Sequence, residues 1–314
     1  MVEEACGKVV RECLGVRAGE VVLIVRDHEQ GQRLHPGLVA ATRQAGGVPI
    51  VVSLPSCRSA EEVPRAARAA LEAADAVLVC TPWILPHEVR RQALTAGVRL
   101  LSLCGVTDAM LERAGEVDYA RLAEVTRAVA TAFERARTLT VTTPGGTAVH
   151  AGVSGQRVIF LDGVADQPGT SSGLPGGVVA ITPVLGSVEG RLVLDGSIEG
   201  LGMVSDPALL TVQSGRVTAV TGGEAARWLE AQWAAEPPDS RLVSEFGIGT
   251  NPFAVYCGSL VEDERVAGSA HVGFGWNTHL GGEILQGTHR DAAMRQPTVH
   301  LDGRVVVRAG ELVL

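Results

Sequence analysis

The chain has 314 residues, of which 46% are apolar and 20% charged, a composition that is ordinary for a globular protein and argues against intrinsic disorder. Its formal net charge of −8, with Lys8 as the only lysine, argues against nucleic acid as a partner. No apolar run reaches the roughly 18 to 20 residues that cross a membrane, and the acidic start of the chain lacks the basic region and apolar core of a secretory signal. We therefore expect a cytoplasmic protein without a membrane partner, and the length predicts two domains.

The first half of the chain alternates between apolar, strand-like runs and helix-like stretches. The runs expected to form strands are Val21–Val25, Val48–Ser53, Ala76–Cys80 and Arg99–Leu103. Between them, Pro36–Ala45 and Ser59–Ala73 are expected to form helices, the second opened by a serine and a glutamate at capping-box spacing. Strands that alternate with helices are typical of a parallel sheet with crossover helices. This pattern predicts an N-terminal, Rossmann-like parallel α/β domain.

The turn after the first expected strand bears on cofactors. A dinucleotide-binding fold places Gly-x-Gly-x-x-Gly there, because glycines let the backbone amides approach the phosphates. Residues 26–31 are Arg-Asp-His-Glu-Gln-Gly instead. The missing glycines argue against a nicotinamide or flavin cofactor.

The character of the sequence changes after a long expected helix, Asp118–Arg137. Beyond it there are short alternating strands and many glycines, and only Glu224–Ala235 has the pattern of a helix. We therefore predict an α/β fold of two domains. Residues 1–137 form the α/β domain, and residues 138–314 form a mostly antiparallel, β-rich, catalytic metal-binding domain.

Asp-Gly pairs in this second half are strong signals for β-hairpins. They are Asp162-Gly163, Asp195-Gly196 and Asp302-Gly303. The last pair is expected to join a terminal hairpin of Val299–Leu301 and Arg304–Val307.

Three short segments in the last third of the chain alternate between polar and apolar positions. They are Glu245-Phe246-Gly247-Ile248-Gly249, His271-Val272-Gly273-Phe274-Gly275 and His289-Arg290-Asp291. Side chains alternate between the two faces of a strand. The first two segments therefore present a polar residue and glycines on one face and apolar residues on the other. In the third segment, His289 and Asp291 are two residues apart, so both are expected to reach one ion.

The polar face of these strands has the composition of a metal site. Glycines beside a polar residue leave room for a metal with its waters or for a substrate. Neutral imidazoles and a carboxylate suit zinc, manganese, cobalt or ferrous iron, and two histidines with one carboxylate leave open positions on the ion. The candidate ligands are His271, His289 and Asp291, with Glu245 beside them as a ligand or a general base. Taken alone, His-x-Asp is a weak signal, because a histidine in a β domain is more often a hydrogen-bonded core or surface residue.

The other histidines carry less information. His279 follows His271 by eight residues in an expected loop, where it is a candidate further ligand or proton carrier, with simple exposure as the alternative. The remaining ones are expected to be structural or superficial: His28, His35, His87, His150 and His300.

Together these segments resemble a known family. The stretches Glu245–Pro252, Gly268–Val272 and Thr288–Asp291 are similar to the metal-binding segments of the aminopeptidase T and aminopeptidase S family of metallopeptidases. The same pattern resembles that of 2,5-dihydroxypyridine 5,6-dioxygenases, which share the fold and carry one ferrous ion. The resemblance runs through most of the chain, including Leu174–Val178 and Asp195–Ser197.

By this resemblance, Glu245, His271, His289 and Asp291 are four candidate ligands of a divalent metal ion, one per chain, and the chain forms a homodimer or a higher homo-oligomer. One position departs from the peptidase pattern. A glutamate after Leu-Pro helps to hold a second metal in that family, and here the position is Val178. A valine cannot coordinate a cation, so the two-metal site is incomplete. The family's metal-binding tyrosine also lacks a match after His271.

These observations predict a metal-dependent hydrolase of a small amide, peptide or related C–N bond, with Glu245 and His279 as its catalytic residues and a small molecule or short peptide as substrate. The ion would lower the pKa of a bound water toward roughly 7. The alternative is a mononuclear iron(II) dioxygenase that opens a dihydroxylated heteroaromatic ring, which the loss of the second-metal glutamate favours. The second carboxylate, Glu245, makes the site harder and more anionic and decides the prediction for hydrolysis. A further alternative is a non-catalytic binding protein with a degenerate metal site, for which Val178 is the best evidence.

Overall fold

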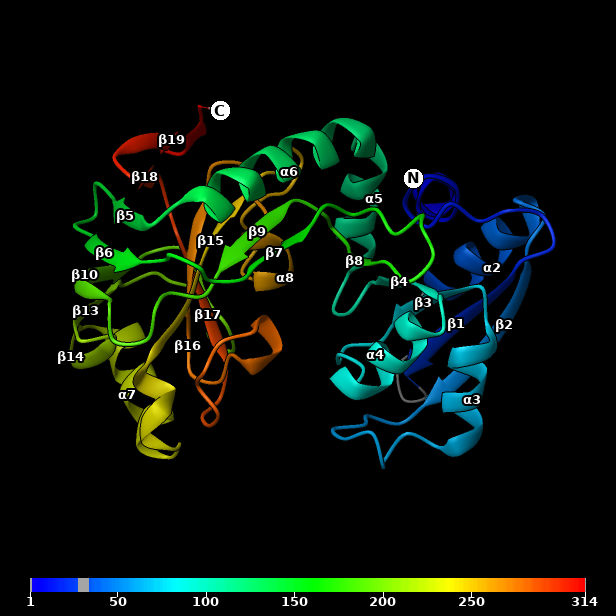
Figure 1. Ribbon diagram of the computed structural model, residues 1–314, viewed down its shortest axis with the longest axis horizontal. Coiled ribbons are helices and arrows are strands. Elements are labelled where there is room, and N and C mark those ends of the chain that lie inside the picture. Colours follow the sequence, from blue (N-terminus) through cyan, green and yellow to red (C-terminus); the bar gives the residue numbers. More distant parts are fainter. Residues whose placement is uncertain (1, 28–33, 314) are drawn as a thin grey trace. The chain divides into compact units, whose positions relative to one another are not determined.

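The computed structural model describes residues 2–27 and 34–313, which fall into two compact units (Figure 1). The first unit consists of Met1–Ala123 and Leu161–Gly176, and the second of Glu124–Phe160 and Gly177–Leu314. Helix α6 (Tyr119–Arg135) runs from the first unit into the second. The division of the chain into domains at residue 137 stays a prediction.

The first unit is built on a five-stranded parallel sheet in the order β2-β1-β3-β4-β8. Its strands are β1 (Val21–Asp27), β2 (Val48–Leu54), β3 (Ala76–Cys80), β4 (Arg99–Ser102) and β8 (Ser171–Gly173). Its helices are α1 (Val2–Lys8), the π-helical turn η1 (Val9–Cys13), α2 (Leu34–Gln44), α3 (Arg65–Ala73), α4 (His87–Thr95) and α5 (Asp108–Glu116). The strands are apolar because helices cover a parallel sheet on both faces, and all five residues of β3 are buried.

Some local predictions for this unit are wrong. Helix α3 begins at Arg65, not at Ser59, because Pro64 takes an extended conformation and starts the helix. The predicted capping box at Ser59 therefore lies in irregular structure. Helices α4 and α5 were not predicted. Residues 28–31 of the turn after β1, on which the argument against a dinucleotide depends, lie outside the described residues.

The second unit contains two largely antiparallel sheets, which confirms the predicted fold class. The eight-stranded sheet consists, in order, of β14 (Arg216–Gly222), β13 (Ala208–Gln213), β10 (Glu189–Leu194), β6 (Ala148–Gly152), β5 (Thr138–Thr142), β18 (Thr298–Leu301), β19 (Arg304–Arg308) and β20 (Glu311–Leu312). The seven-stranded sheet consists of β12 (Gly202–Met203), β11 (Ser197–Ile198), β17 (Arg290–Met294), β16 (Ala270–Phe274), β15 (Val243–Gly249), β9 (Val178–Ile181) and β7 (Val158–Leu161). The short helical elements are α7 (Glu224–Ala234), α8 (Leu260–Asp263) and the 3-10 turns η2 (Pro238–Arg241) and η3 (Thr278–Leu280).

Only one of the three Asp-Gly pairs joins a hairpin. Asp302 and Gly303 have φ angles of 48° and 79° and connect β18 to β19, as a two-residue hairpin turn requires. Asp195-Gly196 connects β10 to β11, which belong to different sheets, and Asp162-Gly163 lies between β7 and β8, which also belong to different sheets. The hairpin prediction is wrong for these two pairs because the chain changes sheets there.

The core of the second unit lies between its two sheets. Phe246, Ile248, Val272 and Phe274 all point into this core, where they meet apolar residues of the eight-stranded sheet such as Leu192. The opposite face of β15 and β16 carries the residues that alternate with these four, namely Glu245, Gly247, His271 and Gly273. The apolar half of each alternating segment thus fixes the strand, and the polar half is presented on the other side of the sheet.

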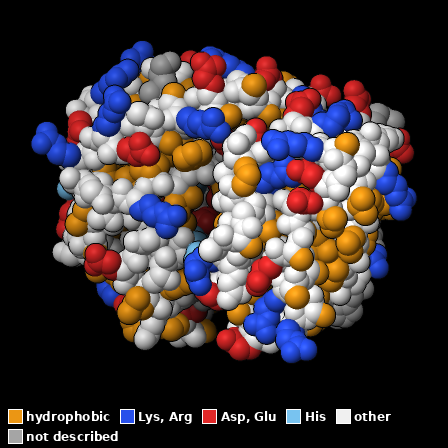
Figure 2. Space-filling view, turned by 45° about the vertical axis from the view of Figure 1, so that its right-hand side comes forward, with side chains coloured by type: hydrophobic (Ala, Val, Ile, Leu, Met, Phe, Trp, Pro, Cys, Tyr) orange, Lys and Arg blue, Asp and Glu red, His pale blue; other side chains and the backbone are white. Residues whose placement is uncertain are grey.

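The outer surface agrees with the acidic, mixed composition. Figure 2 shows basic and acidic side chains interspersed over the face that it draws, without a continuous basic area there. Within the described residues, every helix is too short or too polar to serve as a membrane span.

Candidate metal centre

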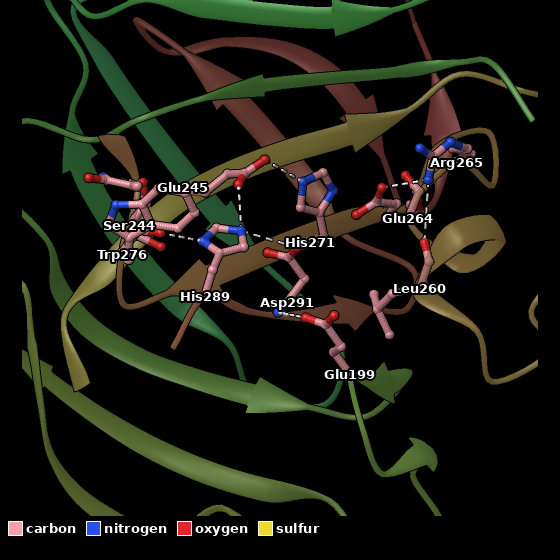
Figure 3. Close-up of polar contacts among 12 residues, drawn as sticks. Glu199, Ser244, Glu245, Leu260, Glu264, Arg265, His271, Trp276, His289 and Asp291 are labelled. Atoms are coloured by element: carbon pink, nitrogen blue, oxygen red, sulfur yellow. Dashed lines mark hydrogen bonds and ion pairs between the residues drawn. The ribbon is translucent and has the colours of Figure 1, made fainter. Parts of the chain in front are cut away.

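The register of the seven-stranded sheet brings the predicted polar residues into adjacent rows. Across β15, β16 and β17, one row consists of Glu245, Gly273 and Asp291, and the next of Gly247, His271 and Ala293. Each ligand candidate in these rows is therefore next to a glycine or an alanine on the neighbouring strand. His289 stands directly before β17 and completes the group (Figure 3).

The side chains converge. Nε2 of His271 lies 3.2 Å from one carboxylate oxygen of Glu245, and Nε2 of His289 lies 3.3 Å from the other. Nε2 of His289 is also 3.3 Å from Oδ2 of Asp291. Glu245, His289 and Asp291 offer ligand atoms that all lie within 4.8 Å of one another. His271 joins this group through its contact with Glu245, so the four predicted residues form one cluster.

The cluster is strongly coupled electrostatically. Burial would raise the pKa of Glu245, but hydrogen bonds from His271 and His289 hold it well below its usual range. Burial would lower the pKa of His271, but the hydrogen bond to Glu245 and the charge of Glu264 raise it to about 9. The pKa of His289 is likewise raised despite its burial, chiefly by Asp291. Without a metal, the histidines are therefore held in the protonated form by the carboxylates.

A divalent cation fits this donor set. Among the described residues, Glu245 and Asp291 form ion pairs with histidines and with no arginine or lysine. Oδ1 of Asp291 and Nδ1 of His271 are buried and have no hydrogen-bond partner among the residues that the structure describes. Buried charges and polar atoms that lack partners are costly. Imidazole nitrogens with carboxylate oxygens suit zinc, manganese, cobalt or ferrous iron, and the same cations would take over the role of the bound protons.

The glycines clear space for the ligand side chains themselves and not, as predicted, for a metal with its waters or a substrate. A Cβ at Gly247 would lie 2.0 Å from Cε1 of His271. At Gly273 it would lie 2.7 Å from Oδ1 of Asp291 and 2.9 Å from Cβ of Glu245. The glycine positions are therefore a steric requirement of the cluster.

His279 lies beside the cluster but is not in its inner group of three. Its ring meets the ring of His289 edge-on at 4.8 Å and stacks on Trp276 at 4.5 Å. Trp276 is exposed and His279 is partly exposed, so the pair leads from the cluster toward solvent. The backbone oxygen of Trp276 accepts a hydrogen bond from Nδ1 of His289 at 2.8 Å.

Sequence reasoning missed several residues around the cluster. Glu199 approaches the backbone N–H of Asp291 at 3.4 Å, and its pKa is raised by burial and by Asp291. The carboxylate of Glu264 is directed toward His271 and pairs with Arg265 (Figure 3). Asn277, which directly follows Trp276 in the chain, is buried. Glu199 directly follows the short strand β11 and so could have been suspected, but no spacing indicates Glu264 or Asn277.

Comparisons with known proteins identify the family of this chain. The family model of 2,5-dihydroxypyridine 5,6-dioxygenase (NicX) matches residues 2–314. The chain belongs to the 2,5-dihydroxypyridine 5,6-dioxygenase family. The 2,5-dihydroxypyridine 5,6-dioxygenase of Pseudomonas putida KT2440 is 29% identical over 261 residues, which cover 79% of this chain and 73% of the relative.

Two solved structures share the fold. The 2,5-dihydroxypyridine dioxygenase from Pseudomonas putida KT2440 superimposes with a TM-score of 0.88 at 24% identity, over 99% of this chain and 96% of that one. Wild-type AmpT from Thermus thermophilus gives a TM-score of 0.69 at 16% identity, over 100% of this chain and 99% of that one. The resemblance to the aminopeptidase T group thus holds for the fold, whereas the family is that of the dioxygenases.

The prediction of a hydrolase is wrong, because the family that matches the whole chain is a dioxygenase family. The prediction gave too much weight to the charge of Glu245. Both of its oxygens contact a histidine, so its charge is largely met within the cluster. Val178 was the better guide: it is the buried first residue of β9, opposite Gly249, where it offers no ligand atom. The predictions of an enzyme and of a metal cofactor hold for the dioxygenase family.

Proposed function

We propose that this chain is a mononuclear iron(II) dioxygenase that cleaves the ring of a dihydroxylated pyridine. The observation that carries the proposal is the convergence of two imidazoles and two carboxylates on one sheet face, in a chain that the dioxygenase family model matches over residues 2–314. Two histidines and one carboxylate leave positions free on the ion for substrate and dioxygen. The proposed substrate class is the one for which the family and the Pseudomonas putida relative are named.

In this proposal, His271, His289 and Asp291 hold the iron. A ferrous ion bound there would supply the redox chemistry that dioxygen needs to react with an aromatic ring. The chain's own residues supply the position of the ion, because His271 lies in β16, Asp291 lies in the neighbouring strand β17, and His289 directly precedes β17. The core face of the same strands keeps that position rigid.

Glu245 is proposed to take a proton from a ring hydroxyl as the substrate binds. Its carboxylate lies at the centre of the cluster, with one oxygen 3.2 Å from Nε2 of His271 and the other 3.3 Å from Nε2 of His289. Direct coordination is the competing role. Glu245→Gln separates the two, because the amide keeps the shape but accepts no proton: retained iron with lost turnover assigns proton transfer, and lost iron assigns coordination.

His279 is proposed to carry protons between the cluster and solvent. Its ring touches His289 on the inside, and the exposed Trp276 covers its other side. His279→Gln should therefore slow turnover and weaken its pH dependence while iron stays bound. An unchanged rate would remove His279 from the mechanism.

The test of the function is oxygen uptake. Metal-free protein is loaded anaerobically with one equivalent of ferrous iron and mixed with 2,5-dihydroxypyridine in aerated buffer. We expect stoichiometric consumption of dioxygen and the substrate, and no consumption with a pyridine that carries a single hydroxyl group. Protein that binds iron but consumes no dioxygen with any dihydroxypyridine would instead support a non-catalytic binding protein.

A further inference from the structure

The segment between β16 and the turn at residues 281–284 is held by one buried amide side chain, that of Asn277. Its Nδ2 donates to the backbone oxygen of Ser244 at 3.0 Å, and its Oδ1 accepts from the backbone N–H of Ile284 at 2.9 Å. The side chain is 3% exposed, so these hydrogen bonds are shielded from water. Asn277 thus joins three pieces of backbone: its own, the far end of the loop, and strand β15 one residue before Glu245.

The same residue fixes the peptide group that precedes it. The N–H of Asn277 donates to the backbone oxygen of Ile284 at 3.2 Å. A trans peptide is planar, with its N–H and C=O pointing in opposite directions. Anchoring this N–H to Ile284 therefore directs the carbonyl of Trp276 the other way, where it meets Nδ1 of His289 at 2.8 Å.

This contact decides which nitrogen of His289 carries a proton. A carbonyl oxygen can only accept, so Nδ1 must donate. In the neutral ring, the lone pair then belongs to Nε2, the atom that lies 3.3 Å from both Glu245 and Asp291. Nδ1 of His271 has no hydrogen-bond partner among the described residues. Of the two imidazoles, only His289 therefore has its metal-binding tautomer set by the backbone.

We propose that Asn277 is a positioning residue of the metal centre: it holds the Trp276 carbonyl against His289 and so keeps the Nε2 lone pair of His289 directed at the cluster. The proposal rests on the metal site proposed above. An asparagine is required because this position needs one donor and one acceptor on the same short side chain. Gly282 makes room for it, since a Cβ there would lie 2.2 Å from Nδ2 of Asn277.

Cobalt(II) binding tests the proposal without turnover. Metal-free wild-type protein and Asn277→Ala are titrated with cobalt(II), and its visible absorption bands report coordination. We expect the Kd of the variant to rise by about 10- to 100-fold, as is typical when a partner of a metal-binding histidine is lost, with altered absorption bands. Asn277→Asp keeps the acceptor for Ile284 but replaces the donor to Ser244 with an oxygen that faces a carbonyl oxygen, so a rise in Kd is expected for this variant as well.

A matched control separates positioning from general loss of stability. Thr147 is also buried, and its hydroxyl bridges the N–H and the oxygen of Val193 in the eight-stranded sheet. Thr147→Ala should lower the Tm of the metal-free protein but leave the Kd and the absorption bands unchanged. Gly282→Ala should displace the intact Asn277 amide and reproduce the weaker binding of Asn277→Ala.

Nitrogen-15 spectra of zinc-loaded protein add a direct readout. In the wild type, the His289 signals should report a protonated Nδ1 and a metal-bound Nε2, and Asn277→Ala should lose this pattern. Folded Asn277→Ala and Asn277→Asp with the wild-type Kd and wild-type bands would overturn the proposal. If the wild type binds neither cobalt nor iron, the metal site itself fails, which is a different result from equal binding by both proteins.

Discussion

Strand β3 of the first unit and strand β15 of the second are both buried along their whole length, but their sequences differ in kind. β3 is apolar on both faces, as the inside of a parallel sheet requires. β15 is apolar on one face, with Phe246 and Ile248 in the core, and carries Glu245 and Gly247 on the other. A buried glutamate needs compensating partners. The comparison teaches that burial alone does not distinguish a structural strand from one that carries a functional site. The residues on each face of the strand do.

The largest effect should come from removing an imidazole on the polar side. His289→Ala is expected to abolish metal uptake with little loss of structure, because the strands are held by their core face. Elemental analysis and circular dichroism measure the two properties. His150→Ala, an exposed histidine in β6, is the control and should keep the metal. Full metal retention in His289→Ala would show that the polar face is not the metal centre.

A substitution on the core face should lower stability and leave metal binding intact. Phe246→Ala removes a fully buried ring and should lower the free energy of unfolding by about 3–5 kcal/mol, because a cavity remains. Denaturant titration measures this loss, and the folded protein should still bind one metal per chain. A loss below about 1 kcal/mol would mean that this face is not a packed core.

A methyl group added on the polar face should reduce both stability and metal binding. Gly247→Ala places a Cβ against the ring of His271, so overpacking should cost about 1–3 kcal/mol of stability and weaken metal binding. Gly152→Ala in β6 is the matched control, since a Cβ there meets its nearest neighbour, Ser187, at 3.4 Å. Equal behaviour of the two variants would contradict a steric role for Gly247.

The smallest effect concerns pH. The pKa of His271 is raised from 6.5 to about 9 in the folded, metal-free chain. A raised pKa stabilises the fold fully below pH 6.5, and this stabilisation is lost as the pH rises through about 9. Metal binding needs the neutral imidazole, so the Kd for the metal should fall over the same interval. Thermal unfolding and metal titrations at several pH values check both trends, and metal-free stability that rises with pH would contradict them.

The sequence predicted the layers of the fold because they depend on local patterns. Ala76–Cys80 is a strand in both the prediction and the structure, and the terminal hairpin forms at Asp302-Gly303. The start of α3 was misplaced because Pro64 outweighs the capping pattern at Ser59. Two Asp-Gly pairs were misassigned because a turn signal does not tell whether the next strand joins the same sheet.

For the site, alternation gave the face of each strand but not the neighbours across strands. That Glu245, Gly273 and Asp291 form one row depends on register, which no single segment contains. Nδ1 of His289 bonds to the backbone oxygen of Trp276. Every residue has a backbone oxygen, so the sequence cannot indicate this contact. The predicted cytoplasmic location and homo-oligomeric state depend on features that lie outside the fold of one chain, and they stay predictions.

The most direct test of the metal centre is a crystal structure of the iron-loaded protein with anomalous scattering measured at the iron edge. We expect one peak per chain, within bonding distance of Nε2 of His271, Nε2 of His289 and the carboxylate of Asp291. Two peaks per chain, or one peak away from these three side chains, would contradict this expectation.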